Sequence, residues 1–147
     1  MCPEQNEFCI KLIESLKART KNGEVEWCNF TEKDYGLFSF LENIIRYSEK
    51  CSMNEYPEYA IKLDKSTYCR INYGKNYNKS MIIGLIFAER SRDRDKILIL
   101  ICSKEDTKEY KVVGDSKKYS ELSKLQEIIE FKNVEEFRIL DQWMMDE

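Results

Sequence analysis

The chain has 147 residues, of which 42% are hydrophobic, 12% aromatic and 35% charged, and its net charge is −3. This length and composition allow one hydrophobic core, which predicts a single α+β domain over residues 1–147 and excludes a disordered chain. The longest apolar run, Met81 to Ala88, is far shorter than the roughly 20 residues of a membrane helix. The first residues also lack the basic and apolar segments of a signal peptide, so we expect a cytoplasmic protein without a membrane partner.

The first element is predicted between Asn6 and Lys21. Apolar residues recur there at helical spacing, and basic residues in the last turn are followed by Gly23, which is typical of a helix end. The expected apolar stripe of this helix consists of Phe8, Cys9, Leu12, Ile13 and Leu16. The alternation from Val25 to Asn29 then predicts a short strand with Trp27 turned inward.

The segment from Thr31 to Ser48 predicts a second helix, from about Asp34 to Glu49, because its apolar residues keep helical spacing after Thr31 as an N-cap. Residues 51–57 contain Asn54 and Pro57, which favour a loop.

An antiparallel sheet of about five strands is predicted next. Residues Tyr59 to Leu63 and Thr67 to Tyr73 resemble two strands of a hairpin joined by residues 64–66. Residues Ser80 to Glu89 and Lys96 to Ser103 are almost continuously apolar, which predicts central strands that are covered on both faces. Residues 90–95 would form the exposed tip between them, and Tyr110 to Val113 would be an edge strand.

The end of the chain predicts two helices that flank the sheet together with the N-terminal helix. We expect the first to begin at Asp115 or Ser116 and to have an apolar stripe of Leu122, Leu125, Ile128 and Ile129. Asn133 interrupts the pattern, and a second helix with Val134, Phe137, Leu140 and Met144 should pack on the first. Trp143, Met144 and Met145 could also contact a partner, whereas core packing is favoured for Trp27.

Residues 16–27, LKARTKNGEVEW, resemble a pattern of small bacterial and phage proteins of unknown function, in which an opening helix ends in a Lys-Thr-x-x-Gly turn before a strand with Trp. The paired terminal helices, with Leu122, Leu125, Val134 and Leu140, are similar to the ends of such proteins. The resemblance implies a sheet between helices and a bacterial, phage or mobile-element origin. It supplies no catalytic residue.

The residue types present argue against catalysis. The chain has no histidine, which excludes every mechanism that needs an imidazole base or ligand. Its six cysteines are scattered without a Cys-x-x-Cys pair, which predicts reduced thiols rather than zinc ligands or a disulfide framework. Its five glycines form no phosphate-binding loop. We therefore expect no enzyme, no metal and no cofactor.

One stretch of the predicted sheet carries a candidate ligand site. Strand alternation places Tyr68 and Arg70 on one face, and Lys75 and Tyr77 would extend it. An aromatic ring beside a guanidinium can stack on a base and pair with a phosphate. The competing interpretation is that Tyr68 covers part of a helix and that the basic residues only hydrate a loop.

Two hypotheses about function follow. The favoured one is a non-enzymatic protein-interaction module whose partner is another protein or a second copy of the chain. The alternative is a domain that sequesters a nucleotide or small anionic ligand at Tyr68, Arg70, Lys75 and Tyr77. Nucleic acid is a disfavoured partner, because residues 1–61 and 119–147 are acidic although residues 62–118 are basic.

Overall fold

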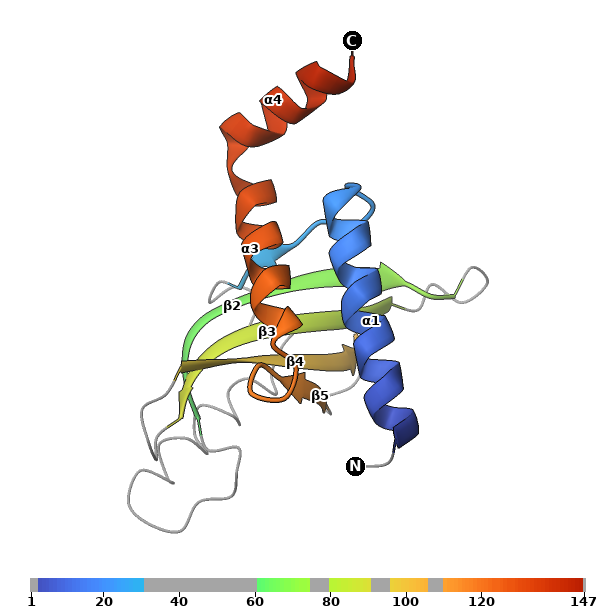
Figure 1. The fold of residues 1–147 in the computed structure, drawn as a ribbon, viewed down its shortest axis with the longest axis vertical. Helices are drawn as coiled ribbons and strands as arrows, with labels where there is room; N and C mark the ends of the chain where they lie inside the picture. The colour runs from blue at the N-terminus through green and yellow to red at the C-terminus, as the bar shows by residue number, and fades with distance from the viewer. Residues whose placement is uncertain (1–2, 31–60, 75–79, 91–95, 106–109, 147) are drawn as a thin grey trace.

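The structure is a computed structural model that describes residues 3–30, 61–74, 80–90, 96–105 and 110–146. The described elements are, in chain order, α1 (Pro3–Lys21), β1 (Cys28–Asn29), β2 (Ile61–Asn72), β3 (Ser80–Arg90), β4 (Lys96–Lys104), β5 (Lys111–Asp115), α3 (Glu121–Asn133) and α4 (Glu135–Met145). The strands form one sheet in the order β1-β2-β3-β4-β5, and all neighbours are antiparallel (Figure 1). The α+β class and the flanking helices are therefore confirmed. The expected helix at 34–49 and loop at 51–57 lie outside the described residues.

Helix α1 presents a buried stripe of Cys9, Ile13, Leu16 and Thr20 to the sheet. It ends where Gly23 adopts a φ of 75°, a conformation that glycine tolerates best. The N–H of Glu24 donates to the Arg19 carbonyl at 2.9 Å, which satisfies one of the last carbonyls of the helix. The expected burial of Phe8 is wrong, because its side chain is 62% exposed. Phe8 lies about 100° around the helix from Cys9, outside the buried stripe.

The indole of Trp27 is buried between α1 and the sheet, as predicted. Its Nε1–H donates to the Thr20 hydroxyl at 3.0 Å, and that hydroxyl donates to the Leu16 carbonyl at 2.6 Å. The expected strand is shorter than the alternation suggested, because β1 contains only Cys28 and Asn29. Trp27 therefore immediately precedes the strand.

The predicted hairpin around residues 64–66 is wrong. Residues Ile61–Asn72 form one continuous strand, β2, which pairs with β3 along its whole length. Leu63 pairs with Ala88 and Lys65 with Phe87, so Asp64 is an extra residue in β2. The polar residues thus mark a β-bulge, which inserts one residue while the long β3 partner keeps the strand extended.

The central strands β3 and β4 are buried on both faces, as their apolar runs predicted. One face contributes Ile83, Leu85, Leu98 and Leu100 to a core shared with α1 and α3. The opposite face buries a second cluster, against which Phe30 and Tyr68 pack; its members are Ile82, Ile86, Ala88, Ile97, Ile99 and Ile101.

The chain leaves the sheet through a turn that is tied to both β4 and β5. The Asp115 carboxylate accepts hydrogen bonds from the N–H groups of Lys117 and Lys118, at 3.0 and 3.1 Å. Ser116 exchanges two hydrogen bonds with Leu98 of β4. These bonds extend the sheet, so the expected helix start at Asp115 or Ser116 is wrong, and α3 begins at Glu121.

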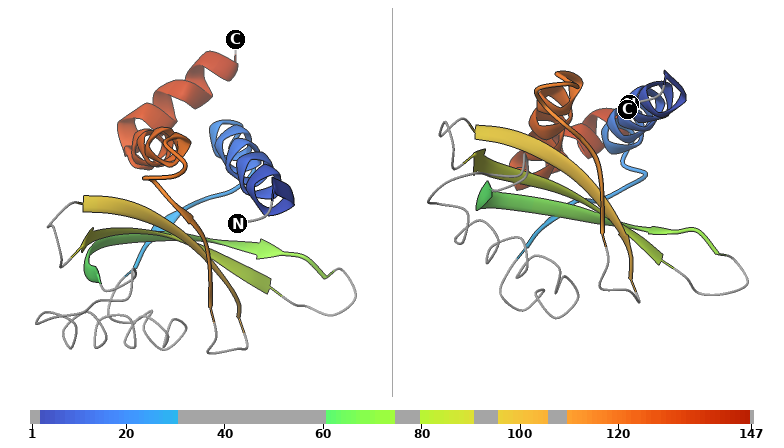
Figure 2. Two further views of the ribbon diagram at one scale, coloured as in Figure 1. Left: turned by 60° about the horizontal axis from the view of Figure 1, so that its bottom comes forward. Right: turned by 90° about the horizontal axis from the view of Figure 1, so that it is seen from below.

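Helices α1 and α3 lie side by side on one face of the sheet (Figures 1 and 2). Lys17 of α1 joins them, since its ammonium binds Glu121 of α3 and also Glu14 at 3.0 Å. Glu121 and then Glu14 raise the pKa of Lys17, whereas Lys17 and then Lys124 lower the pKa of Glu121. Helix α4 continues beyond α3 and extends away from the sheet (Figure 1).

Candidate functional site

The direction of α4 is set at Val134, the single residue between the two C-terminal helices. Val134 has φ −77° and ψ 116°, an extended conformation that breaks the helix. Its N–H donates to the Phe131 carbonyl at 3.3 Å, and its own carbonyl accepts from the Arg138 N–H at 3.1 Å. The chain therefore ends one helix and starts the next at this residue, one position after the predicted break at Asn133.

Side-chain contacts hold the first turns of α4 in this direction. The rings of Phe131 and Phe137 stack with centroids 4.7 Å apart and an interplanar angle of 24°. Lys132 Nζ lies 3.0 Å from Asp141 Oδ2, and Arg138 Nη2 lies 3.8 Å from Glu26 Oε1. A free helix of 11 residues is marginal in water, so these contacts pre-organise α4.

One side of α4 carries five of the six large apolar residues of the helix. At about 100° per residue, these five fall within an arc of about 160°, and Met145, which is 79% exposed, lies outside it. We call this set of five the α4 stripe; it consists of Phe137, Ile139, Leu140, Trp143 and Met144. None of the residues of α4 is buried.

The expected packing of α4 on α3 is thus wrong for most of the stripe. Leu140 is 52% exposed and Met144 57% exposed, although Phe137 and Asp141 in the first two turns do contact α3. Trp143, which the sequence left undecided between core and surface, is 60% exposed. Trp27 in the core is 5% exposed, so the two tryptophans of the chain have opposite environments.

The stripe is large for an exposed apolar surface. An aromatic side chain offers about 150–250 Å², and the stripe residues are between 41% and 61% exposed. Together with Phe131, which is 54% exposed, they leave on the order of 600 Å² in water. That area reaches the upper end of the patches on typical monomers, about 300–600 Å², and approaches the roughly 800 Å² that one partner contributes to a standard interface.

Acidic groups border the stripe. Glu135 and Glu136 occupy its first turn and Asp146 caps its end, while the last turn contains no basic residue. The structure records no ion pair for these three carboxylates within the part of the chain it describes. Arg138 is the one basic residue of α4, and it is placed against Glu26.

The ligand site predicted on β2 has a different environment from the open face that the hypothesis required. The Tyr68 ring stacks on Phe30 at 4.9 Å between centroids and packs against the buried isoleucines of the second cluster. The Arg70 guanidinium lies 3.0 Å from the Glu105 carboxylate. Lys75 and Tyr77 lie outside the described residues.

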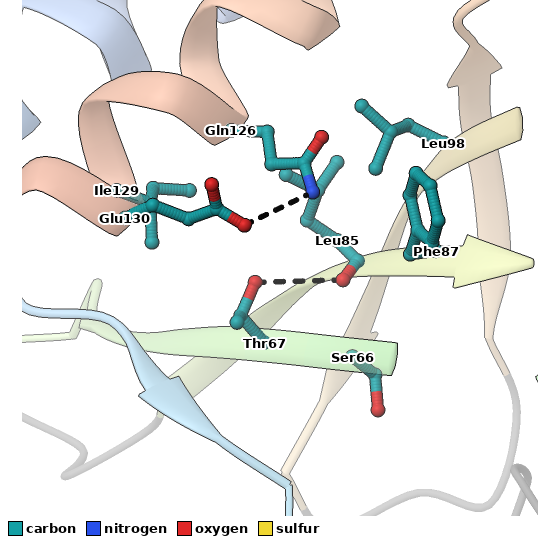
Figure 3. A pocket seen from close by; sticks show the side chains of 8 residues that line it. All are labelled: Ser66, Thr67, Leu85, Phe87, Leu98, Gln126, Ile129 and Glu130. Atoms are coloured by element: carbon teal, nitrogen blue, oxygen red, sulfur yellow. Dashed lines mark hydrogen bonds between the residues drawn. The ribbon is translucent and has the colours of Figure 1, made fainter. Parts of the chain in front are cut away.

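The cavity between α3 and the sheet is too small for a ligand. The space between α3 and the sheet, shown in Figure 3, holds about 10 Å³ and is lined by Thr67, Leu85, Phe87, Gln126 and Glu130 among others. One water needs at least this volume. Gln126 donates to Glu130 at 3.4 Å and Thr67 to the Leu85 carbonyl at 3.5 Å, so the polar groups around it are already paired.

A larger groove of about 320 Å³ is open to solvent between α1 and residues 118–121. Ile10 and Tyr119 line it, together with the carboxylates of Glu14 and Glu121. Both carboxylates bind Lys17, so they are committed to joining the two helices. These two carboxylates are therefore not free to orient a ligand in the groove.

Other types of site receive no support from the described residues. No cluster of three metal-ligating side chains is found among them, and none of their helices combines the length and apolarity needed to span a bilayer. Among the described cysteines, Cys9 and Cys69 are buried, Cys102 is half-buried and Cys28 is exposed. Burial raises the pKa of the Cys69 thiol to about 12, which disfavours the reactive thiolate.

Comparison with protein-family models, with curated proteins and with solved structures finds no match for this chain. The α4 stripe is therefore assigned from its own geometry. Sequence reasoning placed Trp143, Met144 and Met145 among the partner-contacting candidates, but it assigned Phe137 and Leu140 to internal packing. The acidic Glu135-Glu136 start of α4 gives no signal of their exposure, because acidic residues favour the first turn of any helix and the packed helices α1 and α3 have them too.

Proposed function

We propose that this chain is a non-enzymatic interaction module that binds another protein through the α4 stripe. The exposure of the stripe carries the proposal: α3 buries Leu122, Leu125 and Ile129 in the core, whereas every residue of the α4 stripe is exposed. Aromatic residues and methionine are enriched in protein interfaces, and the stripe contains Phe137, Trp143 and Met144.

Pre-organisation of α4 supports the same function. A segment that folds only on binding loses part of its interaction free energy to ordering. The contacts of Phe131 with Phe137 and of Lys132 with Asp141 hold the start of α4 before any partner is present. The sequestering alternative has less support, because Tyr68 stacks on Phe30 and Arg70 pairs with Glu105.

Site-specific photo-crosslinking in the source cell tests the proposal. A photoreactive phenylalanine analogue at position 143 should give a discrete crosslinked product with one partner protein. The matched control places the analogue at position 8, where Phe8 is as exposed as Trp143, at 62% and 60%, but lies on α1. No product from position 8 is expected.

A second variant separates binding from stability. The double substitution Leu140→Gln with Ile139→Gln should abolish the crosslink from position 143 while the melting temperature stays unchanged, because both side chains are mostly exposed. A product that survives this substitution, or the absence of any specific product at position 143, would refute the proposal.

A further inference from the structure

We infer that the partner of the α4 stripe presents an apolar groove bordered by lysine and arginine side chains. This inference rests on the proposed function and specifies the chemistry of the partner. It follows from the shape of the stripe, from the charges around it and from the end of the helix to which those charges belong.

The shape of the stripe fits a groove. Phe137, Leu140 and Met144 are spaced at i, i+3 and i+7, and Ile139 and Trp143 extend the same surface to one side. Such anchors are typical of an amphipathic helix that lies lengthwise in a hydrophobic groove. Helix α4 has 11 residues and is about 16 Å long. Its projection beyond the sheet leaves its flanks accessible to the walls of a groove (Figure 1).

The charges around the α4 stripe favour a partner groove that is bordered by basic side chains. Residues 135–146 contain four carboxylates and one guanidinium. Asp141 is paired with Lys132 and the guanidinium lies against Glu26, which leaves the carboxylates of Glu135, Glu136 and Asp146. Glu136 falls on the same side of the helix as the stripe, between Trp143 and Leu140 around the axis. A partner that covers the stripe must therefore accommodate this carboxylate, which favours a lysine or arginine opposite it.

The C-terminal end of α4 gives the same result independently. The last carbonyls of a helix carry partial negative charge, which basic side chains in the last turn usually offset. The last turn of α4 has no basic residue, and Asp146 follows it. A cation from the partner would neutralise both, so we place basic residues at both ends of the groove.

These charges disfavour the two other partners that an exposed amphipathic helix could bind, a second copy of the chain and a membrane surface. Two copies of α4 in parallel place Glu135 and Glu136 against their equivalents, and in antiparallel they place these residues near Asp146. Helices that bind membrane surfaces carry lysine and arginine on their polar face and are attracted to anionic lipids. The acidic flanks of α4 would be repelled by such lipids.

The test uses the full chain and two synthetic amphipathic peptides, one of leucine and lysine and one of leucine and glutamate in the same pattern. Protection of Trp143 from a soluble quencher reports binding, because Trp27 is already buried. We expect the lysine peptide to bind and to protect Trp143, the glutamate peptide not to bind, and binding to weaken as salt is added.

Charge reversal provides the matched comparison. The variant Glu135→Lys, Glu136→Lys, Asp146→Lys should bind the lysine peptide about tenfold more weakly. The control variant Glu4→Lys, Glu7→Lys, Glu127→Lys changes the net charge equally at exposed sites outside α4 and should bind as the wild type does. Equal binding of both peptides, or equal loss in both variants, would overturn the basic groove.

Failure of the inference and failure of the proposed function give different results. A crosslink at position 143 to another protein that survives charge reversal of α4 refutes only the basic groove. Sedimentation of the free chain as a dimer that Leu140→Gln with Ile139→Gln dissociates would make a second copy the occupant and overturn the inference. Protection of Trp143 by vesicles of anionic lipid, without any protein crosslink, would overturn both.

Discussion

Helices α3 and α4 are consecutive, similar in length and both amphipathic, yet the apolar face of α3 is buried and that of α4 is exposed. Helix α3 buries Leu122, Leu125 and Ile129 against α1 and the sheet, whereas none of the residues of α4 is fully buried. Helix α4 even separates its apolar and polar residues more sharply than α3 does. Amphipathicity thus predicts that a helix has a face to cover, but it does not predict what covers it.

The difference arises at the start of each helix. The turn before α3 is bonded to the sheet through Asp115 and Ser116, and the buried Tyr119 ring packs beneath it. The start of α4 has no hydrogen bond to the sheet among the described residues; Val134, whose extended conformation turns the chain away from the core, sets its direction, and contacts with Phe131 and Lys132 of α3 hold it there. The anchored start fixes α3 on the sheet, whereas the start of α4 directs it into solvent.

Truncation of one leucine in each helix should give the largest contrast. Leu125 is fully buried and Leu140 is 52% exposed. We expect Leu125→Ala to lower the free energy of unfolding by about 2–5 kcal/mol, because it leaves a cavity in the core. Leu140→Ala should change it by less than about 0.5 kcal/mol. Denaturant titrations of both variants check this, and equal losses would mean that α4 is packed in solution.

The packing of Tyr119 that holds the start of α3 can be tested by a substitution at Gly114. A Cβ at this position would lie 2.6 Å from two carbons of the Tyr119 ring, so one of the two must move. We expect Gly114→Ala to cost about 1–3 kcal/mol, measured as a lower melting temperature. The double variant Gly114→Ala with Tyr119→Ala should be no less stable than Tyr119→Ala alone, since the clash is then absent. An unchanged melting temperature for the single variant would contradict this packing.

The buried thiol of Cys69 predicts that the stability of the fold depends on pH. The thiol of Cys69 has its pKa raised from 9.0 to about 12 by burial. The fold therefore favours the neutral thiol, and this contribution to stability is complete below pH 9 and is lost as the pH rises from 9 to about 12. In that window the wild type should lose stability more steeply than Cys69→Ala, by up to about 1.4 kcal/mol per pH unit. Parallel curves for the two proteins would show that Cys69 is more accessible than its 1% exposure indicates.

Local patterns in the sequence were sufficient for much of the fold. The apolar runs of β3 and β4 predicted central strands, and Gly23 predicted the end of α1. Each of these signals arises from residues that are neighbours in the chain, and burial on both faces leaves few alternatives for a strand. The alternation on β2 also placed Cys69 and Tyr68 on opposite faces, as the two buried clusters show.

The failures have a common physical cause. Residues 64–66 have turn composition, but pairing with the long β3 keeps them in one bulged strand. Asp115 has helix-cap composition, but its carboxylate accepts from a turn that is held by β4. In both cases a distant strand supplied hydrogen bonds that outweighed the local preference.

The sequence by itself determined the periodicity of each element, because helix and strand patterns depend only on the spacing of apolar residues along the chain. The tertiary structure alone decided which of these faces found a partner within the molecule. The rings of Tyr68 and Trp27 are packed in the two clusters, whereas the side chain of Trp143 is left in water. Burial depends on where the chain travels after each turn, and a single extended residue, Val134, sets that path for α4.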